Sequence, residues 1–254
     1  MKHAYSSSLQ WLRLALVLSL LAFPALVRAR SLTPQKLAAT TTDFLQKFVD
    51  EAGAVNYAAL QRNPRPLNAL LRDIADFEAA KASADEQFAF YLNSYNVLVI
   101  GSVVAHYPLT SVLDMPGFFN KNRLTVAGEQ LTLDELEHGK LRRLHNDPRL
   151  NFALVCGTAS CPRLSRLAYT SQDISAQLDA QTCLMLQDPA FVRIDAAGRS
   201  VELPEIFQWY KTDFGTSIQA DMAYINAFRA SNAVPPTFAV SFYPYDWTLN
   251  DQKK

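Results

Sequence analysis

The spacing of apolar side chains in the first half of the chain predicts helices. Apolar residues recur three or four positions apart over 35–49 and again over 66–80, which places them on one face of a helix. Ser83 and Glu86 have the spacing of a capping box, and the segment 85–105 that follows is apolar on nearly every side. A helix without a polar face packs inside a protein, so we expect 85–105 to form a central, buried helix.

Short apolar runs between turn signals predict strands in the second half. The run 151–155 is predicted to be an interior strand that delivers Cys156 at its end, and a last strand is predicted over 238–242. Two pairs of runs are separated by glycine-containing turns and are predicted to form hairpins, 123–126 with 130–133 and 192–195 with 200–203.

Helical patterns lie between these strands. Thr132 and Glu135 form a second capping box, so a helix is expected to begin directly after Thr132. Four helices are predicted in this half, over 133–144, over 172–186, around Trp209 and Tyr210, and over 218–228. The alternation predicts an α+β fold, with helices packed around a small mixed or antiparallel sheet and one central buried helix.

The first residues have the pattern of a secretory signal. The apolar run 14–27 is short for a membrane span and is interrupted by Pro24, and it ends in small residues before Ala29. We expect cleavage after Ala29, which would remove 1–29 as a signal peptide and leave a single α+β domain over 30–254. The protein is then periplasmic or secreted, without stable membrane insertion; the alternative is an uncleaved membrane anchor.

Composition excludes some classes of function. The chain has 254 residues, of which 49% are hydrophobic, so it can bury a sizeable core. Its 24 basic residues balance its 24 acidic residues and form no basic block, which disfavours nucleic-acid binding. Metal binding is disfavoured because only His106, His138 and His145 remain after the predicted cleavage. We expect no cofactor, and as a partner we expect a small-molecule or peptide-like ligand.

The strongest candidate for chemistry is the cysteine loop, residues 156–162, which reads Cys-Gly-Thr-Ala-Ser-Cys-Pro. A cysteine at a strand end, before a Ser-Cys-Pro that caps and starts a helix, would lie among free backbone N–H groups. Such a place lowers the pKa of a thiol and can bind an oxyanion. The alternative is a local disulfide between Cys156 and Cys161, because only four residues separate them.

Glu137 and His138 follow the first predicted hairpin. At 100° per residue, Glu137 falls inside the apolar stripe of the helix 133–144, and His138 falls on its border. A carboxylate on an apolar stripe needs a partner, and Arg142 or Arg143 could supply it. In a functional interpretation His138 is the general base for a thiolate, with its tautomer fixed by a neighbouring acid or amide.

Two further sets of polar residues are candidates. Asn93 and Asn96 lie three residues apart on the predicted central helix and share a face. Buried amides must be hydrogen-bonded, so they either satisfy loop backbone or orient a catalytic imidazole or oxyanion. Asp246 lies in the aromatic stretch 243–247, which is either a clasp on the core or, if the tail folds back, part of a relay.

Several segments together resemble the family called domain of unknown function 547, which occurs in exported bacterial proteins and in plant proteins. The resemblance runs from about 55 to 250, and the segments that carry it are Asn93-Ser94-Tyr95-Asn96, Leu136-Glu137-His138-Gly139-Lys140-Leu141-Arg142, Phe152-Ala153-Leu154-Val155-Cys156 with Ser160-Cys161-Pro162, Phe207-Gln208-Trp209-Tyr210 and Tyr245-Asp246-Trp247-Thr248-Leu249-Asn250. We identify the chain as similar to an exported bacterial member.

The resemblance changes the weight of two residues. Asn151 stands where many bacterial members have a histidine, so any role of that imidazole is absent here. In plant members the second cysteine of the loop looks like serine, which implies that Cys156 functions there without a disulfide partner. The family brings no established activity.

Two functions from different classes follow. In the first, the protein is a cysteine-dependent hydrolase or acyl transferase: Cys156 attacks an amide or ester carbonyl, His138 relays the proton, Glu137 supports it, and Asn96 stabilises the oxyanion. Substrate would then be bound by Asn93, Ser160, Cys161 and Asp246. In the second, the protein is a non-catalytic periplasmic binding or scaffold module with a Cys156–Cys161 disulfide.

Overall fold

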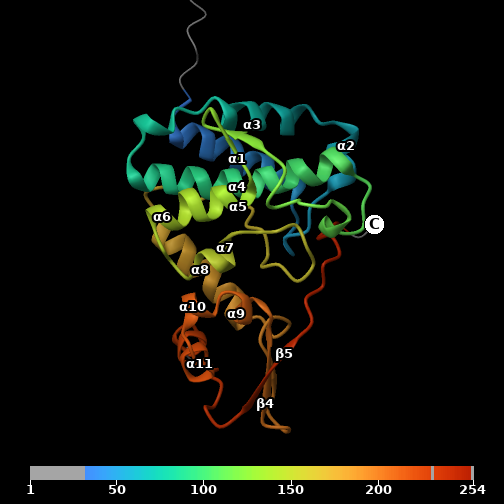
Figure 1. Ribbon diagram of the computed structural model, residues 1–254. Helices are drawn as coiled ribbons and strands as arrows, with labels where there is room; N and C mark the ends of the chain where they lie inside the picture. The colour runs from blue at the N-terminus through green and yellow to red at the C-terminus, as the bar shows by residue number, and fades with distance from the viewer. Residues whose placement is uncertain (1–31, 230–231, 253–254) are drawn as a thin grey trace, which may run out of the picture. The chain divides into compact units, whose positions relative to one another are not determined.

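The longest helix, α4 (Ala84–His106), lies at the centre of the main hydrophobic core in a computed structural model that describes residues 32–229 and 232–252. The predicted signal peptide 1–29 lies outside the described residues. Helices α1 (Pro34–Phe48) and α3 (Arg65–Ala75) pack on one side of α4, and α5 (Leu133–Leu136) packs on the other (Figure 1). Ser83 and Glu86 form the predicted capping box, so the sequence identified both the start of this helix and its central place.

Among the described residues α4 alone has the length and composition of a membrane span, but 78% of its most apolar window is buried inside the protein. Its apolar surface is covered by the surrounding helices, as expected for the core helix of a folded domain.

Three shorter helices precede α4. α1 (Pro34–Phe48) begins at Thr33, whose side chain accepts a hydrogen bond from the backbone N–H of Lys36, and it matches the predicted helix 35–49 closely. α2 (Tyr57–Arg62) was not predicted. α3 (Arg65–Ala75) ends earlier than the predicted 66–80, and the remainder forms a separate 3₁₀ turn, η1 (Ala79–Lys81).

The first predicted hairpin is present. β1 (Leu124–Val126) pairs antiparallel with β2 (Glu129–Leu131), and the two turn residues Ala127 and Gly128 have φ values of 49° and 78°. Two successive positive φ values are typical of a type I′ turn, whose twist matches that of the strands. A short 3₁₀ turn, η2 (Val112–Asp114), precedes the hairpin.

The predicted helix 133–144 is divided into three parts. α5 (Leu133–Leu136) starts at the capping box of Thr132 and Glu135, as predicted. A π-helical segment, η3 (Glu137–Leu141), follows, and α6 (Arg142–Leu144) ends the run. A π-helical turn holds an extra residue, so side chains on either side of it face differently from those of a regular helix.

A second hydrophobic cluster lies around a three-stranded sheet in the order β3-β4-β5. β3 (Arg193–Asp195) and β4 (Ser200–Pro204) form the second predicted hairpin, and β5 (Ala239–Tyr243) pairs parallel with β4. Three helices accompany the sheet, α9 (Ile206–Trp209), α10 (Lys211–Phe214) and α11 (Ile218–Ala227). Helices with small two- and three-stranded sheets confirm the predicted α+β class.

The strand predicted over 151–155 is wrong. The segment forms a short helix, α7 (Leu150–Ala153), in which the N–H of Leu154 donates to the carbonyl of Leu150 at 2.9 Å. An apolar run this short has no periodicity that separates a strand from a buried helical turn. The turn is set by polar side chains ahead of it, because Asp147 accepts from the backbone N–H of Arg149.

The helix expected to start at Ser160-Cys161-Pro162 is also wrong. The next helix is α8 (Ile174–Gln187), which agrees with the predicted 172–186. The hydroxyl of Ser160 accepts from the backbone N–H of Asp246 at 2.8 Å, so this side chain holds the C-terminal segment and does not cap a helix.

Candidate functional site

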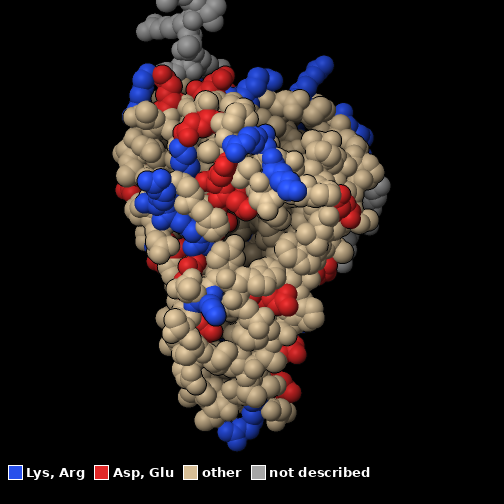
Figure 2. Space-filling model, viewed as in Figure 1, with Lys and Arg blue, Asp and Glu red and all other residues tan. Residues whose placement is uncertain are grey.

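A cavity of about 330 Å³ lies beside the cysteine loop. Residues from α4, α5, η3, α7, α9 and the C-terminal segment line it, so it collects parts of the chain that are far apart in the sequence. Its fifteen lining residues are Tyr95, Phe119, Asn120, Asp134, Glu137, Asn151, Leu154, Cys156, Cys161, Pro162, Ile206, Trp209, Tyr210, Tyr245 and Trp247. Figure 2 shows a hollow near the middle of the face drawn, with acidic side chains at its edge.

Cys156 and Cys161 form a disulfide in the wall of this cavity, with their Cα atoms 6.2 Å apart. The Tyr245 hydroxyl lies 2.9 Å and the Thr158 hydroxyl 3.1 Å from the Cys156 sulfur. Of the two alternatives that the sequence left open for this loop, the structure therefore contains the disulfide. The thiol chemistry considered for Cys156 would require the reduced form.

The conformation of the cysteine loop depends on Gly157. Its φ is +80°, and a Cβ at this position would lie 3.2 Å from a methyl group of Val99, so a larger residue would be strained and crowded. Four backbone N–H groups of the loop already have acceptors. The N–H of Cys156 donates to the Cys161 sulfur, and the N–H of Cys161 donates to the Thr158 carbonyl. The N–H groups of Ala159 and Ser160 donate to the carbonyls of Thr248 and Asp246 in the C-terminal segment. These four groups are thus not available to an oxyanion.

Asp246 does not reach the cavity. The C-terminal segment folds back onto the cysteine loop, as one of the sequence alternatives required, but the Asp246 side chain is exposed and accepts from the N–H and hydroxyl of Thr248 at 2.9 and 2.7 Å. These bonds lower the pKa of Asp246. Asp246 and Ser160 lie at the junction of loop and tail, and neither lines the cavity.

Glu137 belongs to a buried ion-pair network. Its Oε1 accepts from Arg142 Nε at 2.9 Å, and Arg142 Nη1 donates to Asp213 Oδ2 at 2.6 Å. Burial lowers the pKa of Arg142, but the two carboxylates outweigh burial and raise it. The pairing of Glu137 with Arg142 is one of the two interpretations made from the sequence.

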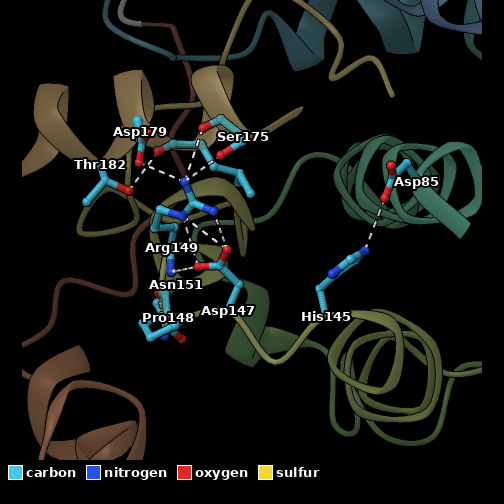
Figure 3. A network of polar contacts seen from close by, with 10 residues as sticks. Asp85, His145, Asp147, Pro148, Arg149, Asn151, Ser175, Asp179 and Thr182 are labelled. Atoms are coloured by element: carbon cyan, nitrogen blue, oxygen red, sulfur yellow. Dashed lines mark hydrogen bonds and ion pairs between the residues drawn. The ribbon is translucent and has the colours of Figure 1, made fainter. Parts of the chain in front are cut away.

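Asn151 completes this network from α7. Its Oδ1 accepts from Arg142 Nη2 at 2.9 Å, and its Nδ2 donates to Asp213 at 2.8 Å and to the carbonyl of Pro148 at 2.9 Å. Arg149 fixes the same turn from the other side, because it binds Asp147 and reaches Ser175 and Asp179 (Figure 3). Both amide atoms of Asn151 are therefore committed to structure.

His138 is not brought to the cysteine loop. Its side chain is exposed, and it is not among the residues that line the cavity. Its neighbour Glu137 is 5% exposed and does line the cavity. The π-helical segment that begins at Glu137 thus turns the carboxylate inward and leaves the imidazole in solvent.

Asn93 and Asn96 satisfy buried backbone groups. Asn96 donates to the Ala153 carbonyl at 3.0 Å and accepts from the Val155 N–H at 2.9 Å. Asn93 makes the same two-sided contact with the backbone of Tyr169, at 2.8 Å in both directions. Asn93 lines a separate cavity of 220 Å³ beside α1, so the two amides do not meet at one site.

Aromatic residues are the part of the site that sequence reasoning missed. Trp209, Tyr245 and Trp247 pack together with ring centroids 4.7 to 5.7 Å apart and form what we call the aromatic wall, and Tyr95 and Tyr210 line the same cavity. Two sequence features could have indicated these residues, namely the pair Trp209-Tyr210 in a predicted helix and the aromatic stretch 243–247. Nothing in the sequence showed that these two segments meet.

Tyr95 lies where the polar groups of the cavity converge. Burial raises the pKa of its hydroxyl, and the charges of Glu137 and Asp134 raise this pKa further. Burial also raises the pKa of Tyr210 to about 12. Both phenols are therefore neutral at physiological pH and present polar tips beside carboxylates.

The central part of the chain matches a known family model. Residues 79–184 match the family described as protein of unknown function, DUF547. The chain carries a DUF547 domain. This confirms the predicted family, although the match is shorter than the predicted 55–250. No curated protein and no solved structure matches the chain.

The DUF547 match contains only part of the cavity. It includes both cysteines, Glu137 and Asn151, whereas Trp209, Tyr245 and Trp247 lie beyond it. The aromatic wall is therefore supplied by the part of the chain that follows the matched residues.

Proposed function

We propose that this protein is an exported, non-catalytic binding module whose DUF547 domain holds a small ligand in the cavity. The observation that carries the proposal is the Cys156–Cys161 disulfide in the cavity wall. A sulfur in a disulfide is not a thiolate, so it cannot attack a carbonyl. In this role the disulfide fixes the loop that supports the ligand.

The positions of the other candidate residues support binding over thiol catalysis. A thiol hydrolase needs a base within hydrogen-bond reach of the nucleophile, and His138 is exposed outside the cavity. Both side-chain groups of Asn96 engage backbone atoms, which argues for a structural role in place of oxyanion binding.

Export is part of the proposal and rests on the N-terminal sequence. The apolar run 14–27 and the small residues before Ala29 are typical of a cleaved signal. Cys156 and Cys161 are both half-buried, so their disulfide is accessible to reductants. Such a disulfide persists in the oxidising periplasm and would be reduced in the cytosol, which favours export.

Thiol labelling of the full chain tests the proposal. Cys183 is a free cysteine and serves as the internal reference. On non-reduced protein at about pH 7, iodoacetamide should modify Cys183 and leave Cys156 and Cys161 unmodified until a reductant is added. His138→Ala should not change this result. Rapid labelling of Cys156 without reductant, slowed by His138→Ala, would overturn the binding module and favour the thiol enzyme.

A further inference from the structure

The wall of the cavity carries negative charge without a free positive partner. Asp134 and Glu137 line it, and no Lys, Arg or His occurs among its fifteen lining residues in the described part of the chain. Arg142 pairs with both Glu137 and Asp213, so its single positive charge is shared by two carboxylates, and Asp134 has no ion-pair partner among the described residues. An anionic ligand would be repelled here, and a cation would be attracted.

Glu137 has an acceptor that the protein does not use. The residue is 5% exposed, and Arg142 binds its Oε1, while Oε2 has no hydrogen-bond partner among the described residues. The Tyr95 hydroxyl, in a residue that is also 5% exposed, likewise has no partner in the described structure. Oε2 and the hydroxyl are not fully enclosed, so they face the cavity that both residues line. A ligand with N–H donors would restore the hydrogen bonds that burial removed from them.

The aromatic wall fits the apolar part of such a ligand. Six of the fifteen lining residues are aromatic, and Trp209 and Trp247 stack with their ring centroids 5.7 Å apart. Aromatic faces attract cations and stack on flat groups, and Trp does so most strongly. The cavity volume, 330 Å³, is at the lower end for ligand sites and therefore suits a small molecule.

We infer that the cavity binds a small organic amine in its protonated form, with the ammonium group between Glu137, Asp134 and Tyr95 and the apolar group on the Trp209–Trp247 wall. This inference deepens the proposed binding function and rests on it. A neutral sugar would also stack on aromatic rings and donate its hydroxyl hydrogens to the carboxylates, but it would leave their negative charge uncompensated.

Three probes of nearly equal shape test the role of charge. Phenethylamine is a cation at neutral pH, 2-phenylethanol is neutral and phenylacetate is an anion. Of the three tryptophans in the sequence, cleavage after Ala29 removes Trp11, so Trp209 and Trp247, both in the cavity wall, are the tryptophan reporters of the exported protein. In a fluorescence titration, phenethylamine should saturate the signal at concentrations at least about tenfold lower than 2-phenylethanol, and phenylacetate should give no saturable change.

Variants assign the effect to the carboxylates. Glu137→Gln should weaken phenethylamine binding by about tenfold and leave 2-phenylethanol binding unchanged. Asp134→Asn gives a second test, because the Asp134 side chain is not part of the Arg142 network and its substitution leaves both of those ion pairs in place. Asp43→Asn is the matched control, since Asp43 is an exposed acid on α1 that does not line the cavity. The Asp43→Asn variant should bind all three probes with the same affinity as the parent protein.

Three results would overturn the inference: equal affinity for the three probes, preference for phenylacetate, or no saturable change with phenethylamine. Equal affinity would leave the binding module intact, because the cavity would still take a ligand. Failure of the module itself would appear separately, as rapid labelling of Cys156 in non-reduced protein.

Discussion

Replacing Asn96 by leucine should destabilise the protein strongly, because this amide on the central helix hydrogen-bonds two buried backbone groups of the segment before the cysteine loop. Asn96 is 5% exposed, donates to the Ala153 carbonyl at 3.0 Å and accepts from the Val155 N–H at 2.9 Å. Leucine has the same number of side-chain heavy atoms and the same branching at Cγ, so it occupies the space but leaves both backbone groups unpaired.

The magnitude follows from the cost of unpaired buried groups. Each costs about 1 to 3 kcal/mol, and the added apolar contact of leucine offsets part of this. We expect a loss of about 2 to 4 kcal/mol in the free energy of unfolding, or roughly 4 to 16 °C in Tm for a protein of this size. Urea denaturation followed by tryptophan fluorescence measures it.

Ser102→Ala is the matched control for this prediction. Ser102 lies on the same helix and is buried, but its hydroxyl has no hydrogen-bond partner in the described structure. Its removal should leave stability unchanged or raise it slightly, because no partner is abandoned. If Asn96→Leu unfolds at the same urea concentration as the parent protein, the amide is not structural and the reasoning is refuted.

Three other predictions concern the stability that the disulfide provides, the pH dependence of stability and export. Cys156→Ser and Cys161→Ser should each lower the free energy of unfolding by about 2 kcal/mol, the value for a loop this short, and unequal losses would show that the cysteines have separate roles. Because hydrogen bonds from Thr248 lower the pKa of Asp246, this carboxylate stabilises the folded state above its ordinary pKa, and the stabilisation is lost as pH falls through the lowered pKa. Thr248→Val should therefore reduce the stability lost between about pH 6 and about pH 3 in urea denaturation; an unchanged pH profile would contradict the assignment. Expression of the full chain in a Gram-negative host should release a soluble periplasmic product that begins at Arg30, and recovery of uncleaved protein in washed membranes would refute export.

Local signals predicted the elements that have strong caps and clear periodicity. α4 and α5 both start at capping boxes read from four residues of sequence, and α1 follows its apolar spacing. The segment 151–155 could not be assigned in this way. Most of its residues are buried, so no polar face indicates the type of element. The outcome depends on Arg149, which binds Asp147 and makes tertiary contacts with Ser175 and Asp179 of α8.

The candidate site was only partly predictable, because it too depends on contacts between segments that are far apart in the sequence. The sequence placed Glu137 on a buried face, and the capping box fixed where its helix starts. It did not reveal the π-helical segment Glu137–Leu141, in which Glu137 is buried and His138 is exposed. The aromatic wall required knowing that residues 209 and 245–247 lie against the cysteine loop, and no local pattern carries that information.

A peptide map of non-reduced protein tests the central claim most directly, namely that the cysteine loop is closed by a disulfide and the cavity binds without thiol chemistry. The protein is expressed with its N-terminal signal, recovered from the periplasm, blocked with iodoacetamide, digested and analysed by mass spectrometry. We predict Cys156 and Cys161 in one peptide that lacks both alkyl groups and is two hydrogens lighter than the dithiol, together with alkylated Cys183. A peptide alkylated at both loop cysteines in the non-reduced sample would contradict the account.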